Sequence, residues 1–148
     1  MRVLLQRVER ASVRVRGDTV AAIGRGLVLL VGIGAGDDGS AVERLAEKLA
    51  TLRVFEDVDG KTNRSLADVN GEVLLVPQFT LYGDVRKGRR PSFDAAAQPE
   101  VAAEQLETLA RALEALGVPV RRGAFREHMA VELVNDGPFT LWLETDAG

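Results

Sequence analysis

The segment "GLVLLVGIG", residues 26–34, constrains the fold most, because it is a continuous apolar run bounded by glycines. A run of this kind, with no polar face, is typical of a strand that is buried on both faces. It therefore predicts a central strand of a sheet. The segment "EVLLVPQFTL", residues 72–81, predicts a second buried strand.

The N-terminal residues predict two further strands. Residues 2–8 and 11–16 carry Val and Arg in alternation, which indicates strands with one buried face. The dipeptide Gly-Asp at residues 17–18 is typical of a hairpin turn.

The C-terminal part of the chain predicts the last strands. They are expected in "VPVRRGAF" (residues 118–125) and in "MAVELVNDGPFTLWLET" (residues 129–145). Asn, Asp, Gly and Pro are common turn residues, so Asn135–Pro138 predicts a turn that joins two strands.

Two segments have helical periodicity. Ser40 predicts the N-cap of a first helix, and Glu43 would complete a capping box. A second helix is expected from Pro99, which suits a first turn, to Gly117, which suits a stop. Apolar residues at helical spacing would form the buried faces: Val42, Leu45, Ala46, Leu49 and Leu52 in the first helix, and Val101, Ala102, Leu106, Leu109, Leu113 and Leu116 in the second.

The fold class expected from these elements is α+β. Two helices interrupt an otherwise strand-rich chain, which argues against a succession of parallel βαβ units. The 148 residues show no repeat, linker or low-complexity segment. We therefore expect one domain over residues 1–148, with a mixed or antiparallel, barrel-like sheet and two main helices.

Composition excludes several kinds of chemistry. The chain has no cysteine and one histidine, so disulfides, thiol nucleophiles and Cys-zinc sites are excluded. Asp57, Asp59 and Gly60 resemble the start of a calcium loop but lack its terminal Glu. The glycines of "GIGAGDDG" lack the spacing of a dinucleotide-binding loop, so we interpret them as a structural turn. No metal and no cofactor are expected.

Hydropathy and charge limit the location and the partners. No apolar run approaches the roughly 20 residues of a membrane span, and the N-terminus alternates from its start, so we expect a cytoplasmic protein without membrane contact. The net charge of −3 excludes a generally basic nucleic-acid coat. However, Arg86, Lys87, Arg89 and Arg90 form a local basic patch that could contact phosphate, unless it is only a solvated loop.

Two side chains are candidates for catalysis on their residue type alone. His128 could act as a general base, because its ordinary pKa lies near neutrality, or it could be a surface residue. Thr80 could be a nucleophile, but a hydroxyl needs a base, and no Thr-His-Asp set is evident. A hydrogen-bonding role for Thr80 is the alternative.

Two motifs together resemble a known family. "PQFTLYGD…RKGRRPSF" in the middle and "VNDGPFTLWL" near the C-terminus are similar to motifs of the D-aminoacyl-tRNA deacylase family, also called D-tyrosyl-tRNA deacylases. The segments "QRVERASVRV" and "GAFREHMAVELVNDGP" also fit, so the resemblance covers essentially the whole chain. Two positions depart from the family pattern: Pro77 replaces a serine, and Phe139 replaces a valine.

The resemblance implies an editing hydrolase without a cofactor. Such enzymes cleave the ester between a D-amino acid and the 3′ end of tRNA, and they remove glycine mischarged onto alanine tRNA. The family is a two-fold homodimer in which Gly137 and Pro138, joined by a cis bond, would enter the partner's site and reject L-amino acids. On general frequencies alone the bond would be trans, since only about 5–6% of X–Pro bonds in folded proteins are cis.

The resemblance also assigns roles to other residues. Gln78 and the backbone N–H of Phe79 would stabilise the oxyanion, and the ribose 2′-hydroxyl would assist attack. The resemblance allows Thr80 to be a nucleophile or a positioning residue, and the missing base favours positioning. Supporting roles fall to Arg7, which would fix the Gly-Pro carbonyls, and to Asn135, Phe125 and Met129. The basic patch would hold tRNA phosphates. Two alternatives stay open: a hydrolase with a Thr80–His128 nucleophile, and a non-catalytic RNA-binding module.

Overall fold

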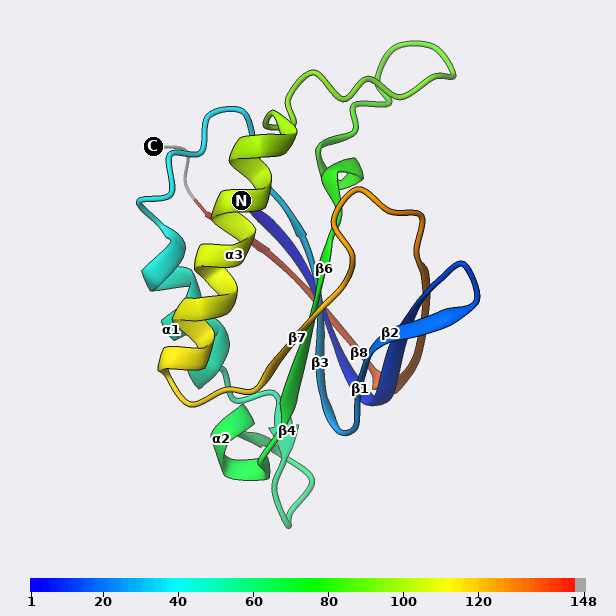
Figure 1. Cartoon of the computed structure of the whole chain (residues 1–148). Helices are drawn as coiled ribbons and strands as arrows, with labels where there is room; N and C mark the ends of the chain where they lie inside the picture. Colours follow the sequence, from blue (N-terminus) through cyan, green and yellow to red (C-terminus); the bar gives the residue numbers. More distant parts are fainter. Residues whose placement is uncertain (146–148) are drawn as a thin grey trace.

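A curved mixed sheet forms the centre of the fold, and two helices cover one of its faces (Figure 1). The computed structural model describes residues 1–145. The strands are β1 (Arg2–Val15), β2 (Asp18–Ile23), β3 (Gly26–Gly32), β4 (Phe55–Glu56), β5 (Thr62–Arg64), β6 (Glu72–Pro77), β7 (Val120–Arg122) and β8 (Ala130–Glu144). The helices are α1 (Val42–Thr51), α2 (Leu66–Val69), the 3-10 turn η1 (Phe79–Tyr82) and α3 (Pro99–Ala115).

Strand β1 organises the sheet. It is one continuous strand, where two separate strands were predicted, and it pairs antiparallel with β3, β2 and β8. The turn to β2 falls at Arg16 and Gly17, one residue earlier than predicted, and both have positive φ angles of 50° and 83°. Two positive φ angles are what a two-residue hairpin turn requires.

The second half of the sheet is parallel, which corrects the expectation against βαβ units. Strand β3 pairs in parallel with β6, and β6 pairs in parallel with β7. Helices α1 and α3 lie in the two connections. The sheet is therefore mixed, as expected, and β2 lies close to β6 and β7, which gives the sheet a nearly closed, barrel-like form.

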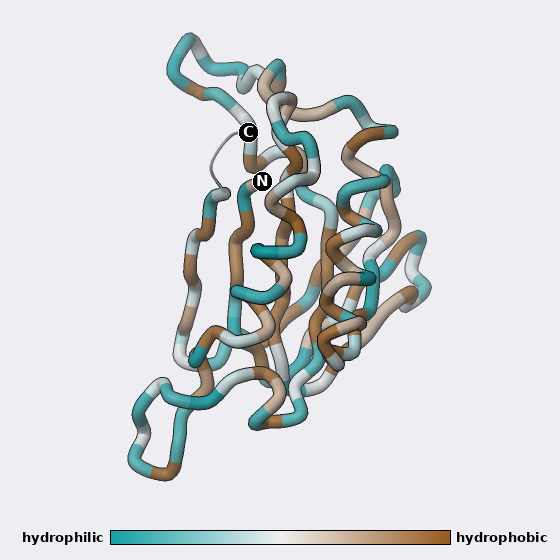
Figure 2. The backbone as a smooth tube through the Cα atoms, turned by 90° about the vertical axis from the view of Figure 1, so that its left-hand side faces the viewer, coloured by the Kyte–Doolittle hydropathy of each residue, from teal (hydrophilic) through white to brown (hydrophobic). Residues whose placement is uncertain are grey.

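Both faces of the central strands are buried, as the apolar run predicted. One core cluster joins Leu27 and Leu29 of β3 to the helices, and a second cluster lies under β2 and includes Val28. Figure 2 shows the resulting concentration of hydrophobic residues along the central strands. Each fully buried aliphatic side chain stabilises the fold by about 1.5–3 kcal/mol. No helix within residues 1–145 is long and apolar enough to cross a bilayer.

Helix α3 begins and ends as predicted, but its buried face is rotated. Pro99 occupies the first turn, and Gly117 follows the helix with a φ of 87°. Val101 and Leu116 are 43% and 48% exposed, although both were placed on the buried stripe. The residues that are buried are Gln105, Leu106, Leu109, Ala110 and Leu113.

The capping box predicted for α1 is wrong. The N-cap of α1 is Ala41, without a side-chain hydrogen bond, and Ser40 donates its own N–H to Asp38 instead. The capping box lies at α2, within a segment predicted as loop, where Ser65 and Asp68 exchange hydrogen bonds. Both serines have an acidic residue three positions later, so the local pattern did not separate the two sites.

Strand β6 ends at Pro77, four residues earlier than predicted. The N–H of Gln78 makes the last bond to β3, at 2.8 Å from the Val31 carbonyl. The chain then winds into η1, in which the N–H of Leu81 lies 3.3 Å from the Gln78 carbonyl. Gln78 and Thr80 consequently lie on a turn beyond the strand.

The expected turn at Asn135–Pro138 is an insertion within one continuous strand, β8. Gln6 lies opposite Thr140 and Val8 lies opposite Asn135, so β8 carries extra residues between two paired arms. We call residues 136–139 the Gly-Pro loop. Asn135 closes it, accepting a hydrogen bond from the Phe139 N–H at 2.8 Å and donating to the Thr140 hydroxyl at 3.0 Å. The Gly137–Pro138 peptide bond is cis.

Candidate active site

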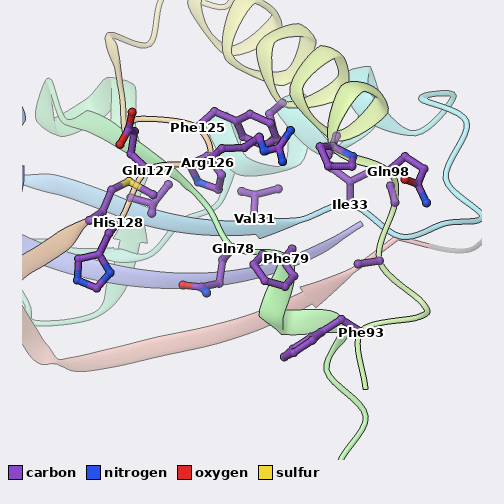
Figure 3. Close-up of a pocket in the computed structure, with 18 of the residues that line it drawn as sticks. Val31, Ile33, Gln78, Phe79, Phe93, Gln98, Phe125, Arg126, Glu127 and His128 are labelled. Carbon is purple, nitrogen blue, oxygen red and sulfur yellow. The ribbon is translucent and has the colours of Figure 1, made fainter. Parts of the chain in front are cut away.

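A cavity of about 680 Å³ lies where β3 and β6 end, beside the first turns of α3. We call it the end cavity. Figure 3 shows labelled side chains of the segments after β6 (Gln78 and Phe79), before α3 (Phe93 and Gln98) and before β8 (residues 125–128). Val31 and Ile33 of the β3 end also line it.

The Gln-Phe-Thr segment contributes a polar pair and an aromatic ring to this region. The Gln78 side-chain amide donates a hydrogen bond to the Thr80 hydroxyl. The Phe79 ring is 58% exposed and packs edge to face against Phe93, with ring centroids 5.1 Å apart. The segment therefore holds Thr80 by an amide, which cannot act as a base.

His128 lines the end cavity but shows no catalytic pairing with Thr80. Within residues 1–145, the hydrogen bonds of the Thr80 hydroxyl comprise only the one from Gln78. In Figure 3 the imidazole points away from Phe79. This geometry offers no support for a Thr80–His128 nucleophile, and it leaves Thr80 as a hydrogen-bonding residue.

Phe125 and Met129 both line the end cavity, as a supporting role requires. Phe125 is 36% exposed, whereas Met129 is partly buried against the second core cluster. Between them, Glu127 forms an ion pair at 3.1 Å with Arg16 of the β1–β2 turn. This wall of the cavity is thus held against the sheet through Glu127 and Met129.

The predicted basic patch lies on a loop that projects beyond the sheet (Figure 1). We call residues 84–92 the basic loop; Asp84 and Ser92 close it with two backbone hydrogen bonds of 2.7 and 2.9 Å. Phe93, which lines the end cavity, follows directly. All four basic residues are exposed.

One of the four basic side chains already has a partner. Arg86 donates to both carboxylate oxygens of Asp84, at 2.9 and 2.7 Å, and these hydrogen bonds lower the pKa of Asp84 to about 2. In the part of the chain that the structure describes, Lys87, Arg89 and Arg90 form no ion pair. They are the charges available to an anion.

The Gly-Pro loop is braced by a buried arginine. Arg7 is 4% exposed; it donates to the Val54 carbonyl at 2.6 Å and to the Asp136 carbonyl at 3.1 Å. Its guanidinium also lies over the Phe139 ring, 4.7 Å from the centroid. The expected contact with the loop is therefore made one residue before Gly137. Gly137 and Pro138 themselves are exposed.

The Gly-Pro loop and the end cavity lie at opposite ends of the sheet. Val8 pairs with both Asn135 and Gly26, so the loop lies at the start of β3. The end cavity lies at the other end, where Val31 pairs with Pro77. Five positions of strand at about 3.3 Å each separate these points by about 17 Å. Gly137 and Pro138 accordingly do not line the end cavity of their own chain.

Phe93 and Gln98 were missed by the residue-level reasoning, although both line the end cavity. Phe93 ends the motif "RKGRRPSF", so an aromatic residue after a basic loop was the available signal. Gln98 precedes the Pro at the start of α3 and carries no such signal. Within residues 1–145, no group of three or more His, Asp or Glu side chains is arranged to hold a metal ion.

The family model and the relatives that match this sequence carry the same kind of name. A family model described as D-Tyr-tRNA(Tyr) deacylase matches residues 4–144. The D-aminoacyl-tRNA deacylase of Thermomicrobium roseum is 60% identical over 145 residues, covering 98% of this chain and 94% of that protein. The protein of the same name from Heliobacterium modesticaldum is 55% identical over 148 residues, covering 100% and 99%.

Solved structures share the fold. The c-Myc DNA Unwinding Element Binding Protein superposes with a TM-score of 0.92 at 40% identity, covering 99% of this chain and 100% of that one. A probable eukaryotic D-amino acid tRNA deacylase superposes with a TM-score of 0.84 at 21% identity, covering 96% and 97%, which speaks to the fold alone. Since the family model and the relatives span nearly the whole sequence, the chain belongs to the D-Tyr-tRNA(Tyr) deacylase family of hydrolases.

Proposed function

We propose that this enzyme hydrolyses the ester between a D-amino acid and the 3′ end of tRNA, in a site that two copies of the chain build together. Beyond family membership, one observation carries the proposal. The Gly-Pro loop lies about 17 Å along the sheet from the end cavity of its own chain, at about 3.3 Å per residue. The two motifs can act on one substrate only if the loop comes from a partner.

The reaction is a hydrolysis supported by the turn after β6. Water attacks the ester carbonyl carbon, and the oxyanion is stabilised by the Phe79 N–H and the Gln78 amide. The first N–H groups of a helical turn have no acceptor inside it, which leaves that of Phe79 free to donate. The bond to the ribose 3′-oxygen then breaks, that oxygen takes a proton, and free amino acid and tRNA result.

Thr80 acts in this scheme by positioning. Its hydroxyl accepts the hydrogen bond of Gln78, so it orients the amide that meets the ester. The proton of the attacking water passes through the ribose 2′-hydroxyl, which makes the RNA part of the catalyst. The absence of a base beside Thr80, within the described residues, favours this division of roles.

Chirality is read by exclusion. The carbonyls of Gly137 and Pro138 from the partner approach the α-carbon, where an L side chain would collide with them. A D-amino acid directs its side chain elsewhere, and glycine has none, so both pass. Glycyl-tRNA formed by mischarging of alanine tRNA is therefore a second substrate.

The basic loop binds the RNA. Lys87, Arg89 and Arg90 are exposed on the basic loop, which leads in the chain to Phe93 of the end cavity, and their contacts are to phosphates. Arg86 contributes less, because Asp84 neutralises it. An enzyme that acts on tRNA in this way would work in the cytoplasm.

Strand β8 supplies the surface for the second copy. Val131, Leu141 and Trp142 are 37%, 37% and 50% exposed, and among the described strands β8 pairs with β1 alone. Exposed apolar side chains along such an edge favour association. Sedimentation at working concentration should give a dimer; an active monomer would contradict the two-subunit site.

The proposed function is tested with three substrates. The half-lives of D-tyrosyl-tRNA, L-tyrosyl-tRNA and glycyl-tRNA are measured with the enzyme and with buffer. The first and third should shorten strongly and the second should not. No deacylation of any substrate would leave an RNA-binding module as the function.

A single substitution separates the two hydrolase mechanisms. Thr80→Val removes the hydroxyl and keeps the shape. It should lower kcat for D-tyrosyl-tRNA by about 10–100-fold if Thr80 positions the site. A loss to the level of buffer alone would identify Thr80 as the nucleophile.

A further inference from the structure

Two glycines at the end of β3 lie directly against the η1 turn. A Cβ atom on Gly32 would lie 2.9 Å from the Gln78 carbonyl oxygen and 3.2 Å from the Leu81 Cβ. A Cβ atom on Gly34 would lie 2.8 Å from atoms of the Tyr82 ring. The distances to the Gln78 oxygen and to the Tyr82 ring are below the 3.0 Å that real Cβ contacts keep. Only a residue without a side chain lets the turn approach this closely.

Gly36, in the loop that follows β3, has no such contact. A Cβ atom on Gly36 would meet nothing within 4 Å, and its φ angle lies outside the left-handed region. The glycines of "GIGAG" therefore serve different purposes, although the sequence pattern suggested one structural turn. Gly32 and Gly34 are packing positions, whereas Gly36 is free to change.

Arg2 holds the same turn at its other end. Its guanidinium donates to the Leu81 carbonyl at 2.8 Å and lies over the Tyr82 ring, 4.3 Å from the centroid. Glu144 of β8 holds the guanidinium in place at 3.0 Å. The Tyr82 hydroxyl in turn donates to Asp37 at 3.4 Å. Strands β1 and β3 and the loop after β3 thus contact a turn of four residues, and β8 supports it through Arg2.

We propose that Gly32, Gly34 and Arg2 are positioning residues for the deacylation, because together they set where η1 lies relative to the ester. The inference rests on the function proposed above. Its physical basis is the peptide unit between Gln78 and Phe79. That unit is planar, so its carbonyl, which lies against Gly32, and its N–H, which would stabilise the oxyanion, rotate together. A side chain at position 32 would push the carbonyl and turn the N–H away.

The expected loss of rate follows from how little displacement of a catalytic group the reaction tolerates. A displacement of about 1 Å at a reacting group can cost about 100-fold in rate, with substrate binding little changed. A misplaced η1 turn should therefore lower kcat and leave KM almost unaltered. A merely destabilised protein would lose activity in proportion to its unfolded fraction and would recover at lower temperature.

The first test compares Gly32, at the end of β3, with Gly36, in the loop that follows. Gly32→Ala should lower kcat for D-tyrosyl-tRNA by about 10–100-fold with KM within about twofold, while Gly36→Ala should match the parent. Thermal unfolding of each variant gives the folded fraction. Equal kcat values in both variants would overturn the inference, as would a loss of kcat no larger than the unfolded fraction.

A second pair of variants tests the proposal if Gly32→Ala fails to fold. Arg2→Met removes the hydrogen bond to Leu81, and Arg14→Met removes a similar β1–β8 ion pair, Arg14 to Glu132 at 2.7 Å. Only Arg2→Met should lower kcat, by about 10-fold, and Arg2→Lys should restore part of it. Equal kcat values for Arg2→Met and Arg14→Met would overturn the role of Arg2. A parent enzyme without deacylase activity would instead refute the proposed function.

Discussion

The two ends of the sheet are built in opposite ways. At one end, the Gly-Pro loop is fixed by Arg7, which is 4% exposed, and by two hydrogen bonds of Asn135. At the other end, the aromatic side chains of the end cavity are a third to more than half exposed, and the basic loop extends into solvent.

This difference matches two different tasks. A group that rejects a substrate by collision must not yield, so it needs buried hydrogen bonds behind it. A cavity that admits many side chains, and a loop that follows a phosphate backbone, need open space. Substitutions around the Gly-Pro loop should therefore change stability and activity, and substitutions in the basic loop should change affinity.

The largest effect is expected for Arg7→Met. This change leaves the buried Val54 carbonyl and the partly buried Asp136 carbonyl without their donor, and a buried unsatisfied group costs about 1–3 kcal/mol. The free energy of unfolding, measured by urea denaturation, should fall by about 2–4 kcal/mol. The exposed Arg14 serves as the control: Arg14→Met should change it by less than about 1 kcal/mol. Similar losses in both variants would show that the two ends do not differ in this way.

Gly137→Ala should come next and should act on all substrates. Gly137 has a φ of 138°, and an added Cβ would lie 3.0 Å from the Phe139 N and 3.1 Å from an Arg7 nitrogen. The strain, about 1–3 kcal/mol, should displace the loop and lower kcat/KM for D-tyrosyl- and glycyl-tRNA by about 10-fold or more. Gly60→Ala, with a φ of 78° and open space around it, controls for backbone strain alone. Unchanged kcat/KM values for Gly137→Ala would show that the Gly-Pro loop takes no part in the reaction.

Removing Lys87, Arg89 and Arg90 together should affect affinity only. Each phosphate contact that is lost should reduce the slope of log affinity against log salt by about 1. The triple alanine variant should therefore raise KM and flatten its salt dependence, and the ratio of D to L activity should stay constant. A changed ratio would mean that the basic loop lines the chiral site.

The smallest effect is expected for Asp84→Asn, which frees Arg86. The gain of one available charge should lower KM by about twofold and steepen the salt dependence slightly. The hydrogen bonds from Arg86 keep the pKa of Asp84 at about 2, below its ordinary value, so the carboxylate stays charged as pH falls until about that value. The difference between variant and parent should therefore be constant from pH 5 to pH 8. A difference that varies over this range would point to another titrating group.

The sequence predicted the elements whose signals are local. The buried strand predicted at 26–34, the helix start at Pro99 and its end before Gly117 depend on neighbouring residues; the structure confirms the helix bounds and a strand that ends two residues earlier, at Gly32. The Gly-Pro loop was predicted as a turn between two strands, because the same residue types suit a turn and an insertion. Only the pairing of Gln6 and Val8 across the sheet separates the two cases, and pairing is not local.

The motifs of the candidate site could be predicted from the sequence, but their relative positions in the fold could not. The resemblance named Gln78, Phe79, Gly137 and Pro138, while their separation along the sheet depends on how β1 aligns with β3 and β8. The contacts of Gly32 with η1 were hidden for a related reason. A glycine that ends a strand looks the same whether or not another segment lies against it.

The two-subunit site proposed above would also make activity depend on the amount of enzyme. In that site a two-fold pair completes two sites at once, and dissociation abolishes both. Activity per chain should then fall on dilution, because the dimer concentration follows the square of the free chain concentration. Mixing a chain altered at Gln78 with a chain altered at Gly137 should restore one intact site in each mixed pair. Two variants that are inactive separately would therefore regain activity when mixed.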